Sequence, residues 1–283
     1  MQEENAYLID DYFLDVPAQS SNGLLAVDAD AREQIAVWFL RIVQAIDCSI
    51  HIAEISLSCL DRFVSTENGR MILLDRSQYQ LAALTALYSS VKTHNESALT
   101  LDIVVKLARD EFNKSDIEAM ERRMLDAIRW RVNPPTTSDF LRIYLKMSRV
   151  WNWLDTSTQD IILELVDYQI NLSIIEYEIS ISKASHIAMA SLLNATKSIC
   201  PEETGNLHES MCEVAFSCGI DEESVEILQE TLYKAMLSEN RVKIKAHNES
   251  VCGRSVKTKA DSSTAPESPR TVYDFTRAGG VIV

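Results

Sequence analysis

The sequence predicts an all-α protein built from two tandem five-helix domains and a disordered C-terminal tail. Glycine and proline are scarce, with 7 and 6 copies in 283 residues, and a turn-rich sheet protein needs more of both. Apolar residues recur at steps of three and four, which is the period of one helical face. The adjacent prolines Pro134-Pro135 interrupt this pattern near the middle of the chain. We expect five helices on each side of them.

The first half of the chain carries three helical segments with clear periodicity. Residues 32–46 and 49–65 each place apolar residues on one face, at steps of three and four. Residues 78–92, "QYQLAALTALYSSVK", differ because small or apolar residues occupy nearly the whole circumference. A helix of that kind contacts neighbours on all sides. Residues 78–92 are therefore predicted to form a central helix of the first domain.

The last helix before the prolines is predicted from a capping signal. Ser115 is followed three positions later by Glu118, which is the spacing of a capping box. We therefore expect a helix at about 116–130. After the prolines, a second series of helical segments is expected at about 137–149, 158–172, 183–198, 207–218 and 222–239.

These segments divide the chain into four regions. An N-terminal segment, 1–29, precedes a first domain, 30–135, and a second domain, 136–241. Residues 242–283 are polar and lack helical periodicity, and such a composition buries too little apolar surface to offset chain entropy. We expect this tail to be disordered. Within it, Ser268 precedes a proline and is a candidate proline-directed phosphorylation site.

The charge balance argues against nucleic acid and membranes as direct partners. The chain has 42 acidic and 27 basic residues, a net charge of -15, which repels phosphate backbones and anionic lipid surfaces. No run of about 18 apolar residues occurs, and the acidic start "MQEENAYLIDDYF" is unlike a basic targeting sequence. Six scattered cysteines form no disulfide framework. We expect a soluble intracellular protein with reduced thiols.

The sequence shows no pattern typical of an enzyme. The phosphate-binding motif G-x-x-x-x-G-K-[ST], the dinucleotide motif G-x-G-x-x-G, the nucleophile motif G-x-S-x-G and the zinc motif H-E-x-x-H are all absent. His208 and Cys212 lie four residues apart on an expected helix, but two ligands are too few for a metal site. We therefore expect no catalytic residue, no metal and no cofactor.

Several short motifs stand in order along the first half of the chain. They are Arg32 with Trp38, "CLDRFVS" at 59–65, Lys92, "MERRMLDAIRW" at 120–130 and "NPPTTSDFL" at 133–141. In their order and approximate spacing they resemble a cyclin box, and the match covers about residues 30–145. The second half resembles a cyclin C-terminal domain in the number and length of its helices.

The resemblance implies a structural ion pair between Arg32 and Asp61. In cyclins the aspartate of the D-R-F element pairs with the arginine that opens the first helix. An aspartate near the end of one helix can reach an arginine at the start of its antiparallel neighbour when the connection is short, as "IDCS" suggests. The alternative is a pair exposed to solvent, which would contribute little to stability.

The resemblance also implies a kinase-binding surface. Lys92 and Glu121 match the two charged residues with which cyclins hold the regulatory helix of their kinase. Leu125 lies on the same predicted helix as Glu121, and Trp130 follows it. An aliphatic and an aromatic anchor beside opposite charges are typical of a partner-binding surface. The alternative is that Lys92 only complements the dipole of its own helix.

Cyclin-like proteins regulate kinases and are not enzymes themselves. The resemblance implies a regulatory subunit that forms a heterodimer with a cyclin-dependent serine/threonine protein kinase, activates it and controls cell-cycle progression. It implies a place in the nucleus, the cytoplasm or both. The alternative is a cyclin-fold transcription adaptor or scaffold without kinase activation. An adaptor that binds DNA would need a basic surface, whereas this chain is strongly acidic.

Overall fold

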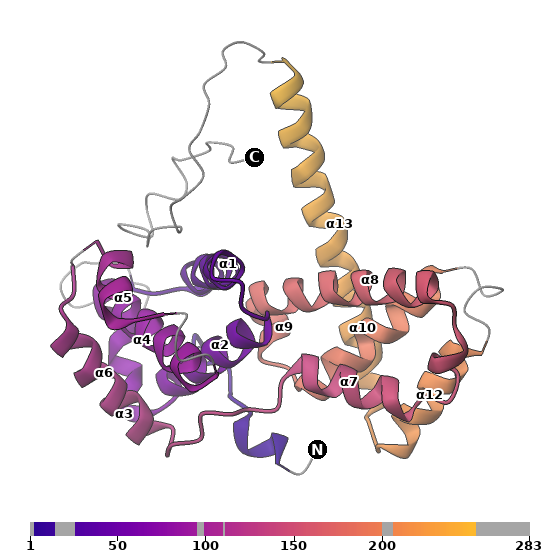
Figure 1. Cartoon of the computed structure of the whole chain (residues 1–283), viewed down its shortest axis with the longest axis horizontal. Helices are drawn as coiled ribbons and strands as arrows, with labels where there is room; N and C mark the ends of the chain where they lie inside the picture. Colours follow the sequence, from indigo (N-terminus) through magenta and orange to yellow (C-terminus); the bar gives the residue numbers. More distant parts are fainter. Residues whose placement is uncertain (1–2, 15–25, 95–98, 110, 200–205, 253–283) are drawn as a thin grey trace. The chain divides into compact units, whose positions relative to one another are not determined.

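Every regular element of the described chain is a helix, as Figure 1 shows. The described residues fall into two compact units, the first ending at Thr136 and the second beginning at Thr137. Each unit contains five helices of seven residues or more, which confirms the predicted all-α fold of two tandem domains. The computed structural model of the protein describes residues 3–14, 26–94, 99–109, 111–199 and 206–252.

The first unit is organised around α4, Arg76–His94. Its residues from 81 to 87 are all buried, and α4 contacts both α2 and α6. Alanines line this stretch, so neighbouring helices approach α4 closely on several sides. The other helices of the unit are η1 (Glu4–Tyr7), α1 (Ala29–Ala45), α2 (His51–Val64), α3 (Glu67–Arg70), η2 (Met71–Leu74), α5 (Leu101–Leu107) and α6 (Lys114–Ala127).

The start of α6 differs from the sequence-based expectation. The capping box is formed by Asn113 and Asp116, and not by Ser115 and Glu118. The Asn113 side chain accepts a hydrogen bond from the Asp116 backbone at 3.1 Å, and the Asp116 carboxylate accepts one from the Asn113 backbone at 2.9 Å. Asparagine caps helices as well as serine does. The helix therefore begins two residues earlier than expected, and Ser115 lies inside its first turn.

Replacing Asn113 by alanine tests this cap. We expect Asn113→Ala to lower the free energy of unfolding by about 1 kcal/mol, because the first turn of α6 loses a hydrogen-bond acceptor. Ser115→Ala serves as the control and should change stability by only a few tenths of a kcal/mol, since alanine is a good helix former. Urea denaturation of both variants measures the difference. Equal losses of stability in the two variants would contradict the assignment of Asn113 as the cap of α6.

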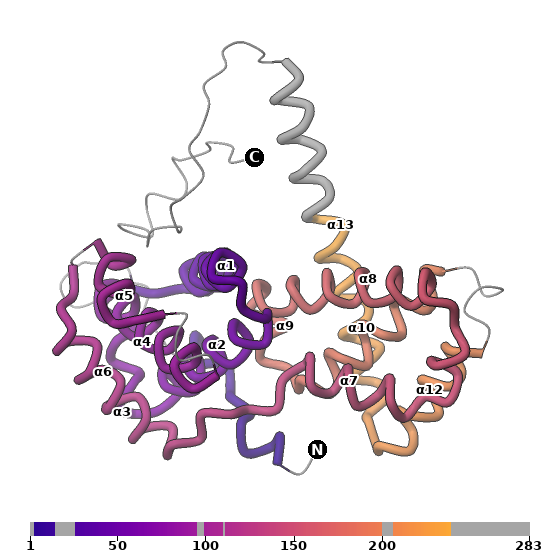
Figure 2. The backbone as a smooth tube through the Cα atoms, viewed as in Figure 1, coloured from indigo at the N-terminus to yellow at the C-terminus, as the bar shows by residue number. Residues whose placement is uncertain are grey.

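The second unit is organised around α10, Ala184–Ser198, which contacts α7, α8, α12 and α13; Figure 2 traces its backbone. The Asn194 side-chain amide on α10 donates to the Gln169 side-chain oxygen on α8 at 3.0 Å and to the Gln229 backbone carbonyl on α13 at 3.1 Å. It also accepts a hydrogen bond of 3.1 Å from the Gln229 side chain, so its polar atoms are satisfied inside the unit. The remaining elements are α7 (Thr137–Met147), η3 (Trp151–Trp153), α8 (Thr156–Ile175), α9 (Tyr177–Ser180), α12 (Leu207–Ser217) and α13 (Glu222–Cys252).

The end of the second unit extends past the boundary chosen from sequence. Helix α13 continues to Cys252, whereas the sequence analysis ended the domain at residue 241. Side chains are described only as far as residue 238. The rest of the expected disordered tail, residues 253–283, lies outside the described residues, and so does the phosphorylation candidate Ser268.

Candidate functional site

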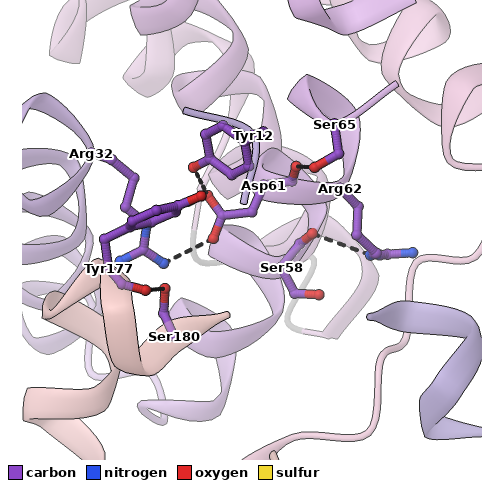
Figure 3. Close-up of polar contacts among 8 residues, drawn as sticks. All are labelled: Tyr12, Arg32, Ser58, Asp61, Arg62, Ser65, Tyr177 and Ser180. Carbon is purple, nitrogen blue, oxygen red and sulfur yellow. Dashed lines mark hydrogen bonds and ion pairs between the residues drawn. The ribbon is translucent and has the colours of Figure 1, made fainter. Parts of the chain in front are cut away.

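Arg32 and Asp61 form a buried ion pair between α1 and α2 (Figure 3). Arg32 lies in the first turn of α1 and is 1% exposed, and Asp61 lies near the end of α2 and is 3% exposed. The guanidinium donates to both carboxylate oxygens, from Nη2 at 2.8 Å and from Nε at 3.4 Å. Two parallel contacts of this kind fix geometry as well as charge. The pair therefore holds the two helices in one register.

A tyrosine from the N-terminal segment completes this ion pair. The Tyr12 hydroxyl donates a hydrogen bond of 2.8 Å to the Asp61 carboxylate. Burial raises the pKa of Tyr12 well above its ordinary value, and the nearby negative charge of Asp61 raises it further. Burial by itself would lower the pKa of Arg32, but the Asp61 carboxylate holds it above its ordinary value. At neutral pH the cluster thus contains a neutral tyrosine and a charged arginine.

The raised pKa of Tyr12 predicts a loss of stability in alkali. Because the folded-state pKa lies above the unfolded value of about 10, the folded protein binds more protons than the unfolded chain above pH 10. Stability is then fully present below about pH 10 and falls as the pH rises toward the folded-state pKa. Urea unfolding between pH 8 and 11 should show this fall in the unmodified protein and a weaker one in Tyr12→Phe. Identical pH dependence in both proteins would contradict the assignment.

The neighbouring Arg62 connects three segments of the first unit. Its Nη2 donates to the backbone oxygen of Arg131 at 2.8 Å and its Nε to that of Ser58 at 3.1 Å. Its guanidinium also lies 4.8 Å from the centre of the Tyr7 ring, a cation–π distance. The two adjacent charges of the "DRF" element therefore attach the N-terminal segment and the segment after α6 to the end of α2.

Lys92 and Glu121 meet at the surface, between the last turn of α4 and the middle of α6. The Lys92 ammonium lies 2.8 Å and 2.9 Å from the two carboxylate oxygens of Glu121. Ser89 donates a further hydrogen bond of 2.8 Å to the same carboxylate, and the ammonium is 5.1 Å from the centre of the Tyr88 ring. Lys92 is 47% exposed and Glu121 14% exposed, so solvent screens the ammonium end of the pair, and its contribution to folding is about 1 kcal/mol.

Leu125 on α6 and Trp130 in the turn after it follow Glu121 along the chain. Leu125 follows Glu121 by four residues, so both side chains lie on the same face of the helix. Trp130 is 65% exposed, and its indole nitrogen donates to the Asp126 carboxylate at 3.1 Å. The Trp130 backbone nitrogen also donates to the Leu125 carbonyl at 2.8 Å. The structure thus places an exposed indole five residues after Leu125 and nine after Glu121, just past the end of α6.

The turn that carries Trp130 has a strained backbone. Arg129 and Trp130 have φ angles of 55° and 58°, in the left-handed region that costs roughly 1–2 kcal/mol for each residue with a Cβ atom. Two consecutive residues of this kind are uncommon without glycine, and such strain is often found at functional sites. Neither position carries glycine or asparagine, so the residue types do not predict this turn. The strain directs a large apolar side chain toward solvent.

Neither a metal-binding group nor a membrane span is found among the described residues. No group of three or more His, Cys, Asp and Glu side chains among them could hold a metal ion. His208 instead shares a hydrogen bond of 2.9 Å with the Thr196 hydroxyl. None of the described helices combines the length and the apolar character that a membrane span requires.

Two family models match the chain almost end to end. The model described as "Cyclin, N-terminal domain" matches residues 1–133, and the model described as "Cyclin, C-terminal domain" matches residues 135–265. The X-ray structure of a viral cyclin from herpesvirus saimiri is similar with a TM-score of 0.54 and 17% sequence identity. That likeness covers 74% of this chain and 87% of the viral one, and it concerns the fold alone.

Curated relatives at modest identity are cyclins as well. Cyclin-B2-1 of Arabidopsis thaliana is 23% identical over 188 residues, which cover 66% of this chain and 40% of the relative. G1/S-specific cyclin-D1 of Xenopus laevis is 25% identical over 114 residues, which cover 40% of this chain and 38% of the relative. The chain therefore spans about two fifths of the length of these relatives. With both family models matched in order along its length, the chain belongs to the cyclin family.

Proposed function

We propose that this cyclin is the regulatory subunit of a cyclin-dependent serine/threonine protein kinase, and that Lys92, Glu121, Leu125 and Trp130 bind the regulatory helix of that kinase. The observation that carries the proposal is the Lys92–Glu121 pair, in which Lys92 is 47% and Glu121 14% exposed, with Glu121 on a helix that ends shortly before the exposed Trp130. The pair adds little to folding, because the Lys92 ammonium is open to solvent. A binding role accounts for its position, and cyclins are regulatory proteins rather than enzymes.

The two charges suit the polar groups of a docking helix. Lys92 offers N–H donors to backbone carbonyls or to an acidic side chain, and Glu121 offers acceptors to backbone N–H groups. In the free protein these two groups satisfy each other at 2.8 Å, so neither Lys92 nor Glu121 is an unpaired charge before binding. Leu125 and Trp130 supply the apolar area that is removed from water when a helix covers them.

Activation requires the bound state to favour the active kinase. The small lobe of a protein kinase carries a helix whose glutamate must pair with a lysine that holds the ATP phosphates. A cyclin that binds this helix only in its inward position shifts the kinase population toward the active conformer. This chain then acts by binding energy alone and supplies no group to the phosphoryl transfer.

We propose that the heterodimer controls cell-cycle progression from the nucleus, the cytoplasm or both. The names of relatives, such as the G2/mitotic-specific cyclin-2 of Medicago sativa, support a cell-cycle role. We assign the kinase contacts to the first domain, residues 30–135, and leave residues 136–241 as a second cyclin domain. Ser268 remains a candidate phosphorylation site.

Binding to a panel of purified cyclin-dependent kinases tests the proposal. We expect one or more kinases to bind the unmodified chain, and Lys92→Ala and Glu121→Ala each to weaken that binding. Lys197→Ala, at the end of α10, and Glu118→Ala, exposed on α6, are matched controls that should bind normally. Binding without an increase in kinase activity would favour a scaffold. Equal binding by the Lys92, Glu121 and control variants would refute the proposed surface.

A further inference from the structure

The exposed Trp130 lies between two arginines. Arg129 and Arg131 are both exposed, and no hydrogen bond or ion pair of either side chain is found within the described part of the chain. Residues 121–131 contain four arginines and two carboxylates, which gives this segment a charge of +2 in a chain of net charge -15. A local surface of positive charge is thus present on a strongly acidic protein.

The two carboxylates of this segment are already engaged. Glu121 is paired with Lys92 at 2.8 Å, and Asp126 accepts the hydrogen bond of the Trp130 indole at 3.1 Å. The guanidinium groups of Arg129 and Arg131 therefore face solvent with no described carboxylate beside them. The left-handed φ angles of Arg129 and Trp130 set the directions in which these two side chains leave the backbone.

We propose that Arg129, Trp130 and Arg131, here called the Arg-Trp-Arg surface, select a kinase whose small lobe carries carboxylates around an apolar pocket. Trp130 fills the pocket, and each of the two guanidinium groups faces a carboxylate of the kinase. An arginine and a carboxylate can pair through two parallel hydrogen bonds. A kinase with basic residues at these positions is rejected by like-charge repulsion. The proposal rests on the proposed function, because it names the chemistry of that same partner.

An acidic protein surface fits these residues better than a nucleic acid does. Exposed arginine and tryptophan also bind single-stranded nucleic acids, where bases stack on the ring. Such binding depends on many phosphate contacts, however, and two free guanidinium groups on a chain of net charge -15 provide few of them. Tryptophan and arginine are also the residues that dominate protein–protein interfaces.

Charge reversal in the full-length chain tests the proposal. The probe is whichever purified kinase of the panel binds the unmodified chain most tightly. We expect the double variant Arg129→Glu/Arg131→Glu to bind it at least about 10-fold more weakly, with a smaller dependence on salt concentration. The charge-preserving variant Arg129→Lys/Arg131→Lys should retain most of the affinity. Lys146→Glu/Arg149→Glu, two exposed cations of the second unit, is the matched control and should bind normally.

A compensating exchange on the kinase provides a second readout that a folding defect cannot imitate. Lysines placed at the acidic positions of the kinase small lobe should restore binding of Arg129→Glu/Arg131→Glu and weaken binding of the unmodified chain. If the reversed variant binds normally while Lys92→Ala and Glu121→Ala do not, the Arg-Trp-Arg proposal is wrong and the proposed function stands. If no kinase binds, both are wrong. If the chain binds a single-stranded oligonucleotide and charge reversal abolishes that binding, the partner of the Arg-Trp-Arg surface is a nucleic acid and the kinase proposal is wrong.

Discussion

Asp61→Ala is expected to lower the free energy of unfolding of the first unit by about 3–5 kcal/mol. The substitution leaves the Arg32 guanidinium, 1% exposed, without its carboxylate partner, and an unpaired buried charge is the costly outcome. It also removes the acceptor of the Tyr12 hydroxyl. Urea denaturation followed by tryptophan fluorescence measures the loss, because Trp38 lies in α1, the helix that carries Arg32, and is buried.

The physical cause can be separated from general damage to the core. Replacing both members, as in Arg32→Met/Asp61→Leu, removes the unpaired charge, so the double variant should be more stable than Asp61→Ala alone. Lys114→Ala, which breaks an exposed ion pair with Asp102, is the control and should leave stability unchanged within error. Losses that simply add in the double variant would contradict the account of the pair.

Trp130→Ala is expected to cause the largest loss of kinase affinity. A tryptophan anchored in a partner's pocket contributes about 2–4 kcal/mol, which corresponds to a roughly 30- to 1,000-fold higher Kd. The stability of the free protein should change little, because the side chain is 65% exposed. Isothermal titration calorimetry with the purified kinase measures the affinity, and thermal unfolding checks the fold.

A second exposed tryptophan provides the matched control for this prediction. Trp153 in η3 of the second unit is 82% exposed, so Trp153→Ala removes the same chemistry from a different surface. It should bind the kinase as the unmodified chain does. Equal affinities of Trp130→Ala and Trp153→Ala would remove Trp130 from the interface and leave its strained turn without a role.

The fold was predictable because its signals are periodic and local. Helical periodicity located the helices on both sides of Pro134-Pro135, and the uniform small-residue content of 78–92 indicated a central helix, which α4 is. The start of α6 was misplaced because Asn113 and Asp116 form the same hydrogen bonds as the Ser115-Glu118 pattern, and residue types alone do not rank two overlapping capping motifs.

The candidate site was only partly predictable because its contacts join distant parts of the chain. The resemblance named Arg32 and Asp61, but the contribution of Tyr12 depends on how the N-terminal segment returns to the end of α2. No local pattern encodes that path. The resemblance treated Lys92 and Glu121 as two separate contacts for a partner, whereas the structure shows them bonded to each other.

The left-handed turn at Arg129 and Trp130 was not predictable for a different reason. Residues with a Cβ atom rarely adopt φ angles near 55°, so sequence rules assign such a turn to glycine or asparagine. Tertiary contacts enforce it here, among them the hydrogen bond from Arg62 to the Arg131 carbonyl at 2.8 Å. The exposure and flanking charges of Trp130 became apparent only with the structure.

Kinase activation by the purified chain tests the central claim most directly. A cyclin-dependent kinase that binds the chain is titrated with it, and the phosphorylation rate of a histone-type substrate is measured. Our account predicts a saturable rise in rate for the unmodified chain. For Lys92→Ala/Glu121→Ala, it predicts that the half-maximal concentration moves at least about 10-fold higher. No rise with the unmodified chain, or the same half-maximal concentration for both proteins, would contradict it.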